Sequence, residues 1–339
     1  METRKLQQVG GGTFTVSVPK AWAVEHGLSA GSEVHIYPHG DGSLVVRGAE
    51  HDGESLDAVR IDLEGGQPAL VERALRAANA VGFETVTLRS RDGFTDEQRR
   101  RARQVTREVV GTTVVAEGRD ELTVRTLLDA TDVSIRQSVV QLQFVALSIH
   151  RAGTEAFVDA GGDARERLTE RVGEAHRLSA MVTRHFNRSL VSLGEVDRLG
   201  LSRTQLYEYD VAARELSSVA DLGASIARLG ERRVEPLSAE EVNAVERAAE
   251  AARTVVDGAT SSLLSGDGPS SVYTVLDRRD EAMADLEDID CRLVDGSPAT
   301  HALTRFVDDL VRTLDHGEAI AETALRVALR SGVRPSVAP

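Results

Sequence analysis

The pattern of apolar and polar positions divides the chain into three parts. Residues 1–50 alternate apolar and polar side chains and are rich in Gly, Val and Ser, which predicts short strands. Residues 55–126 switch between strand-like and helix-like periods, and residues 127–331 carry apolar side chains at helical spacing. We therefore predict a mixed fold: a small β domain, a small α/β module and a long all-α region.

The first domain is predicted to contain three strands and one short helix. Asp41-Gly42 is a strong signal for the turn of a hairpin. The helix spans Lys20–His26, directly after Pro19, which favours the first turn of a helix. The strands, identified by their β-branched content, are Thr13–Val18, Glu33–Tyr37 and Ser43–Arg47.

The second domain is predicted to run β-α-β-α-β-β, with both helices on one face of a small sheet. Thr95 and Gln98 form a capping-box signature that opens the second helix, and Gly111 ends it. The other predicted elements are Val59–Glu64, Ala69–Val81, Thr85–Ser90, Thr112–Glu117 and Glu121–Arg125.

The third domain is predicted to consist of six long helices joined by short loops, an arrangement typical of bundles. Ser218–Ala227 and Thr313–Ala321 are similar strings near the ends of the third and sixth helices, which indicates a duplicated three-helix unit. The predicted helices span 132–153, 163–192, 202–229, 238–265, 271–294 and 300–330.

Composition indicates a soluble cytoplasmic protein. Apolar residues make up 41% of the chain, and no apolar run is long enough to cross a membrane. The first residues lack the apolar core of a signal peptide, and the single cysteine, Cys291, has no partner for a disulfide.

The net charge of −14 has an unusual form, because lysine occurs only at Lys5 and Lys20 and every other basic residue is arginine. An acidic, lysine-poor surface is typical of halophilic proteins, whose carboxylates keep them hydrated in high salt. Such a protein is a poor general binder of nucleic acid, so any contact with DNA has to be local.

The first domain resembles the AbrB/MazE/SpoVT family of swapped-hairpin DNA-binding domains. The resemblance is carried by the strings Gly11–Trp22, Gly27–Val34 and Asp41–Val46, which keep their order and spacing. It implies a homodimer that exchanges hairpins into one β-barrel and lays basic side chains along DNA. By that resemblance the contacts are Arg4, Lys5 and Lys20 to phosphates, with Thr13, Thr15 and Ser17 near the same face. The alternative is a β domain that only dimerises.

The helix predicted after Thr95 carries five arginines. Arg99, Arg103 and Arg107 fall on one helical face, with Arg100 beside them. This row favours either a phosphate or DNA stripe, or an ordinary solvated face balanced by Asp96, Glu97 and Glu108.

Residues 127–331 resemble PhoU, a family of duplicated three-helix bundles linked to phosphate uptake. Four strings carry the resemblance, in the family's order: Glu170–Leu178, Tyr209–Leu216, Glu281–Leu286 and Leu310–Glu322. It implies a pair of three-helix bundles that respond to phosphate status, with a phosphate ABC transporter or a signalling protein as partner.

PhoU proteins can bind divalent metals through carboxylates spaced i, i+4 on helices. This chain keeps only a partial set, Glu281, Asp285 and Asp315, because His176, Ser217 and Val311 stand where the family has carboxylates. The alternative is that Asp315 and Asp221 cap helices or pair within them. His316 is a candidate ligand or base, or a surface histidine. No nucleophile triad or zinc motif is present, so we expect no enzyme and no cofactor other than a possible metal.

Two functions fit these resemblances. One is a DNA-binding transcriptional regulator of phosphate uptake that senses phosphate status through its helical region. The other is an adaptor that does not bind DNA but docks on a phosphate ABC transporter and regulates it negatively. An enzymatic third possibility, a metal-dependent phosphate hydrolase, depends on the carboxylates that remain.

Overall fold

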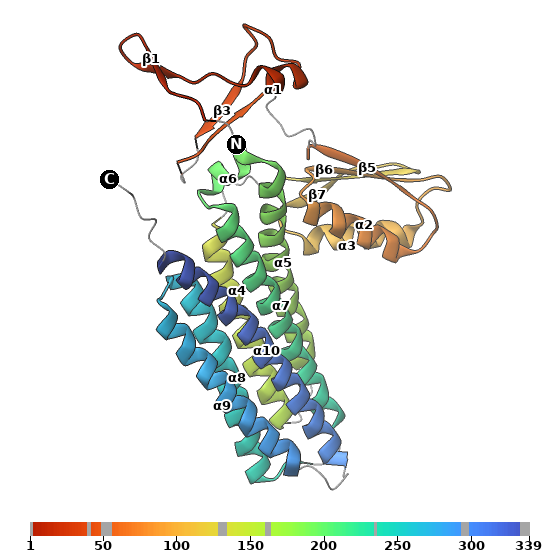
Figure 1. Ribbon diagram of the computed structural model, residues 1–339. Coiled ribbons are helices and arrows are strands. Elements are labelled where there is room, and N and C mark those ends of the chain that lie inside the picture. The colour runs from red at the N-terminus through yellow and green to blue at the C-terminus, as the bar shows by residue number, and fades with distance from the viewer. Residues whose placement is uncertain are drawn as a thin grey trace. The chain divides into compact units, whose positions relative to one another are not determined.

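A computed structural model describes residues 3–38, 42–48, 56–127, 134–159, 164–233, 236–292 and 298–332. The chain forms two compact units. One contains residues 1–55 with 191–193, and the other contains residues 56–190 with 194–339 (Figure 1).

The N-terminal unit contains two antiparallel hairpins and one short helix. Strands β1 (Gln7–Val9) and β2 (Thr13–Thr15) form the first hairpin, and β3 (His35–Pro38) and β4 (Leu44–Arg47) form the second. Helix α1 (Lys20–Glu25) lies between them in sequence and has Pro19 as its N-cap. In one chain these are two separate two-stranded sheets, so the predicted barrel of exchanged hairpins remains a prediction about two chains.

The predicted strands of this unit are present but shorter. The strand predicted over Thr13–Val18 ends at Thr15, and the one predicted from Glu33 begins at His35. β1 was not predicted. Gly42 has a φ of 83°, which suits the predicted turn, while Asp41 lies outside the described residues.

The α/β module has the predicted order β-α-β-α-β-β. It consists of β5 (Ala58–Leu63), α2 (Pro68–Val81), β6 (Thr85–Ser90), α3 (Asp96–Glu108), β7 (Thr112–Glu117) and β8 (Glu121–Thr126). The sheet order is β5-β6-β8-β7, with β5 and β6 parallel and the other pairs antiparallel. Both helices cover the same face of the sheet (Figure 1), as predicted.

Side chains from α2, α3 and the central strands form the core of this module. Val71, Leu88, Ala102 and Leu122 are completely buried there. The capping box predicted at Thr95 and Gln98 is confirmed, because the Thr95 hydroxyl accepts from the Gln98 amide and the Gln98 side chain accepts from the Thr95 amide.

The described residues of the helical region form six long helices and one short one. The short helix α6 was not predicted, and α4 runs six residues past its predicted end. None of the described helices is long and apolar enough to cross a membrane. The elements are α4 (Ile135–Asp159), α5 (Ala164–Val191), α6 (Leu193–Leu199), α7 (Arg203–Arg232), α8 (Ala239–Ser265), α9 (Pro269–Arg292) and α10 (Pro298–Gly332).

The buried side chains of these helices form one continuous core. Helix α4 packs along α7, α8 packs along α10, and contacts of α4 with α8 and of α7 with α10 join the two pairs. The predicted pair of three-helix bundles stays a prediction, because one core spans the helices of both halves. The reason is that α4, α7, α8 and α10 all direct apolar side chains to the same interior.

Glycines set the closest approach between these helices. A Cβ on Gly223 of α7 would lie 2.6 Å from His150 Cα of α4, and a Cβ on Gly317 of α10 would lie 3.0 Å from Val255 Cγ1 of α8. These two glycines occupy equivalent places in the similar strings of α7 and α10, each two residues after an aspartate. Gly153 of α4 faces Gly223 across the crossing and lets the two helices pack closely. The prediction that this helix ends at residue 153 was wrong, because α4 continues to Asp159.

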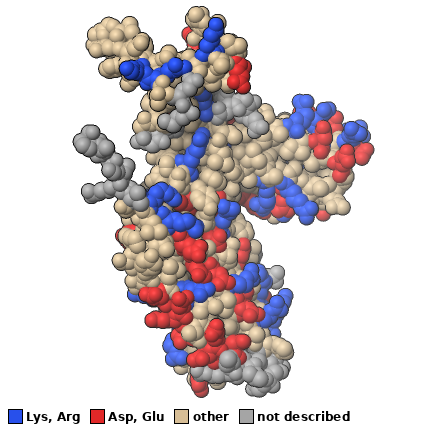
Figure 2. Space-filling view, viewed as in Figure 1, with Lys and Arg blue, Asp and Glu red and all other residues tan. Residues whose placement is uncertain are grey.

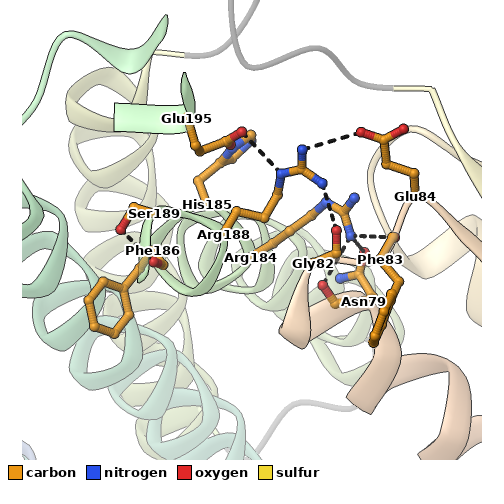
Figure 3. Close-up of polar contacts among 10 residues, drawn as sticks. All are labelled: Asn79, Gly82, Phe83, Glu84, Arg184, His185, Phe186, Arg188, Ser189 and Glu195. Carbon is orange, nitrogen blue, oxygen red and sulfur yellow. Dashed lines mark hydrogen bonds and ion pairs between the residues drawn. The ribbon is translucent and has the colours of Figure 1, made fainter. Parts of the chain in front are cut away.

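Three side chains of α5, Arg184, Asn187 and Arg188, bind the C-terminal end of α2 and join the α/β module to the helical region. Figure 3 shows the two arginines. The three side chains satisfy carbonyl groups that the end of a helix leaves without partners, and two of them bring positive charge to the negative end of the helix dipole. The bonds run from Arg184 Nη1 to the carbonyl oxygens of Asn79 (3.1 Å) and Phe83 (3.0 Å), from Asn187 Nδ2 to that of Ala80 (2.7 Å) and from Arg188 Nη1 to that of Gly82 (2.7 Å).

A buried carboxylate holds Arg188 in place. Glu195 of α6 is 1% exposed and accepts from Arg188 Nε at 3.0 Å and from His185 Nδ1 at 2.6 Å (Figure 3). Burial raises the pKa of the Glu195 carboxyl, but the hydrogen bond from His185 and the charge of Arg188 outweigh it and leave that pKa below its usual value. Glu195 is therefore ionised at neutral pH and helps to compensate the charge of Arg188.

A histidine lies within the helical core. His150 of α4 is fully buried, with its Nε2 3.2 Å from Thr313 Oγ1 of α10, and Arg253 Nη1 of α8 donates to its Nδ1 at 3.4 Å. Burial, followed by the charge of Arg253, lowers the pKa of the His150 imidazole to about 3. The ring is therefore neutral at pH 7 and connects three helices of the core.

We predict that Gly223→Ala destabilises the protein. The added methyl group would meet backbone atoms of α4 that cannot move alone, and overpacking of this kind costs about 1–3 kcal/mol. Gly173→Ala on α5 is the matched control, because a Cβ there meets no atom closer than Arg177 Nη1 at 3.5 Å. It should be neutral or stabilising by up to about 1 kcal/mol. Urea unfolding monitored by circular dichroism measures both, and equal stabilities for the two variants would contradict the close crossing.

We also predict that stability falls in acid through His150. The pKa of the His150 imidazole is 6.5 in the unfolded chain and about 3 in the folded protein. Below the unfolded pKa the unfolded chain therefore binds a proton that the folded protein excludes, and stability is lost as the pH falls. Between pH 7 and pH 4.5 the wild type should lose about 2–3 kcal/mol more than His150→Gln. If the unfolding free energies of the wild type and His150→Gln change with pH by the same amount, His150 is not buried in its neutral form.

Candidate nucleic-acid interface

The first hairpin places Phe14 on one face and both of its threonines on the other. Gln7 lies opposite Thr15 and Val9 opposite Thr13, and directly opposed residues of an antiparallel pair share a face. Phe14 and Gln8, which are also paired, lie on the other face. The predicted contacts Thr13 and Thr15 are thus side by side, and the Thr15 hydroxyl donates to the Gln7 carbonyl at 3.3 Å.

All six predicted DNA contacts are exposed to solvent: Arg4, Lys5, Thr13, Thr15, Ser17 and Lys20. Ser17 continues the alternation of Thr13 and Thr15 but lies outside the strand, and Lys20 is the first residue of α1. The structure therefore brings the two threonines together on one face. A contact of the six with DNA remains a prediction.

Apolar side chains of the N-terminal unit have no interior in a single chain. Within the described ranges of this unit, residues 3–38 and 42–48, no residue is buried. Phe14 is 67% exposed, and the other large apolar side chains exposed in this unit are Leu6, Val9, Val16, Val18, Val24, Val34, Ile36 and Leu44. Exposed apolar surface on this scale marks an interaction site.

Residues 1–48 of the N-terminal unit do not share the acidity of the whole chain. They contain four acidic side chains, Glu2, Glu25, Glu33 and Asp41, and four basic ones, Arg4, Lys5, Lys20 and Arg47. The full net charge of −14 is therefore carried by the rest of the chain. Residues 1–48 therefore repel a polyanion less than the rest of the chain does.

The arginine row on α3 is paired with carboxylates of the same module. Arg99 and Arg103 contact Glu117 at 3.3 and 2.8 Å, and Arg101 contacts Glu72. Basic and acidic side chains accordingly lie side by side over the module in Figure 2. These ion pairs favour the solvated face over a DNA stripe. The arginines were expected to be balanced by Asp96 and Glu97, but their main partners are Glu72 and Glu117.

The predicted metal ligands are not assembled. Within the described ranges, no group of three or more His, Cys, Asp or Glu side chains is arranged to hold a metal ion. Asp315 instead contacts Arg279 at 3.5 Å, and Glu318 contacts the same guanidinium at 2.8 Å. An arginine therefore already supplies the positive charge at Asp315, which corrects the prediction of a site at Glu281, Asp285 and Asp315.

His176 and the candidate ligand His316 form hydrogen bonds between helices. His176 of α5 contacts Asp221 of α7 at 3.0 Å, and His316 of α10 contacts Glu215 of α7 at 2.6 Å. Asp221 and Asp315 therefore pair across helices, and not within a helix as the alternative had it.

A comparison with family models identifies the N-terminal unit. Residues 7–48 match the family described as antidote-toxin recognition MazE, bacterial antitoxin. The chain thus carries a MazE/AbrB-like domain at its N-terminus, as its glycine and hairpin strings predicted. A search of curated proteins gives no match.

We predict that Phe14→Asp prevents self-association of this domain. A carboxylate on the apolar face would be buried without a cation, and a cost of several kcal/mol weakens association by about 100-fold or more. Thr13→Asp is the matched control, because Thr13 is the next residue and lies on the opposite face. Light scattering should give the mass of a dimer for the wild type and for Thr13→Asp. A dimeric Phe14→Asp variant would show that this face is not the contact.

Proposed function

We propose that this protein is a dimeric DNA-binding regulator, in which paired N-terminal domains bind DNA. The match of residues 7–48 to the MazE family carries the proposal. The two faces of the first hairpin support it, since the exposed Phe14 lies on one face while Thr13 and Thr15 lie together on the opposite one. The retention of both lysines in the first twenty residues of a chain with no others points the same way.

The finer proposal is that the protein controls phosphate uptake. It rests on the four strings of residues 127–331 that resemble PhoU. The equivalent close crossings at Gly223 and Gly317 support an internal duplication of the kind that PhoU has. In this proposal the helical region senses phosphate status through a partner protein and has no enzymatic activity. A signal there changes the relative geometry of the paired N-terminal domains and thereby the affinity for DNA.

Lys5→Ala together with Lys20→Ala tests the DNA-binding role. A dimer would lose four phosphate contacts, each of which contributes about 0.9 to the slope of log K against log salt, so the slope should become shallower by about 3–4. The control is Arg100→Ala with Arg107→Ala, which removes the same charge from exposed positions on α3. Mobility shifts over a salt series measure both variants, and light scattering confirms that both stay dimeric.

The adaptor that docks on a phosphate ABC transporter is the second candidate. The net charge of −14 favours it, because an acidic protein pays an electrostatic cost on DNA. If the lysine variant and its control bind DNA equally weakly at every salt concentration, the N-terminal domain serves dimerisation only and the adaptor is the better account.

A further inference from the structure

Helices α4 and α8 form an open groove on the helical region. They run antiparallel, since Gln143 contacts Asp257 at 2.9 Å near one end and Arg151 contacts Glu250 at 3.5 Å near the other. Between these contacts lies a groove of about 630 Å³. None of the DNA-binding residues proposed above belongs to it.

An unusually exposed aromatic side chain stands at the edge of this groove. Phe144 is 71% exposed and Val140, one turn earlier on α4, is 42% exposed. Leu147 continues the apolar row toward the middle of the groove, and Thr254 of α8 lines the opposite wall. The surface therefore offers a projecting apolar group directly beside a hollow large enough to receive one.

The charges lining the groove differ in sign between its ends. Asp257 lies at one end, while Arg151, Arg253 and Glu250 lie at the other and sum to one positive charge. A two-fold axis through the middle of the groove would place the acidic end of one copy against the basic end of the other. An interface of this symmetry must be complementary to itself.

We propose that this groove is a second contact between two copies of the chain, in which Phe144 of each copy enters the groove of the other. The adjacent knob and hollow and the opposed end charges favour a second copy over an unrelated partner. The proposal rests on the dimer of the proposed function, because chains already joined through their N-terminal domains meet at high effective concentration. Within such a dimer, the groove contact can form even if it is too weak to join two separate chains.

Cysteine cross-linking of the full chain tests this contact. In a Cys291→Ser background, Thr254→Cys should form a covalent dimer with a short bis-maleimide reagent. Adding Phe144→Ala should lower the cross-linked fraction about tenfold or more, because the groove of the other copy would lose the apolar side chain that fills it. Tyr273→Cys, on α9 and 51% exposed, is the control and should not cross-link.

Light scattering of the same samples separates this proposal from the dimer on which it rests. A dimeric mass with no Thr254→Cys cross-link overturns the groove contact, leaves the N-terminal dimer intact and assigns the groove to another protein. A cross-link that survives Phe144→Ala also overturns it. A wild type that is monomeric and does not cross-link overturns both the groove contact and the proposed dimer. A dimer that cross-links through the groove but does not bind DNA counts against the proposed function alone.

Discussion

The apolar side chains of the N-terminal hairpins have no core within one chain, and the proposed function depends on how they are covered. A two-stranded hairpin is marginally stable by itself in water, and the described residues of this unit bury none of their side chains. In the proposed dimer, a second copy that contributes the same hairpins would supply the missing interior. It would also repeat the face that carries Thr13 and Thr15, so that the event that stabilises the domain would build the surface that meets DNA.

In the larger unit, polar contacts hold the α/β module against the helical region. Apolar packing fixes each part, but their junction is polar. Arg184, Asn187 and Arg188 bind the carbonyl end of α2. Buried Glu195 compensates the charge of Arg188 (Figure 3). Because buried charges without partners are costly, these groups specify one docking geometry more strictly than an apolar contact would. The α/β module and the helical region therefore move together if a signal moves either.

Much of this fold was predictable from periodicity, and the failures have physical causes. The capping box at Thr95 and the order of the α/β module depend on local signals and were correct. The strand β1 was missed because Gln7 and Gln8 carry no β-branched signal and are placed by their pairing with β2. The end of α4 was misplaced because Gly153 looks like a helix stop in sequence but serves a close helix crossing.

The candidate site was predictable only in part, because pairings between distant segments leave no local pattern. The glycine and hairpin strings found the N-terminal domain, and the register then placed Thr13 and Thr15 on one face. The metal set failed because Arg279 on another helix compensates Asp315, which no spacing of carboxylates reveals. The junction at α2 was missed for the same reason, since Arg184 and Asn79 lie 105 residues apart.

Binding of the wild-type protein to DNA upstream of phosphate-transport genes tests the central claim most directly. A mobility shift over a range of salt, with unrelated competitor DNA present, is the measurement. The account predicts a specific complex that survives the competitor, with a slope of log K against log salt that is shallow for a DNA-binding protein because few phosphates are neutralised. Absence of any specific complex, at low salt and at high salt, would contradict the claim that the N-terminal domains bind DNA to control phosphate uptake.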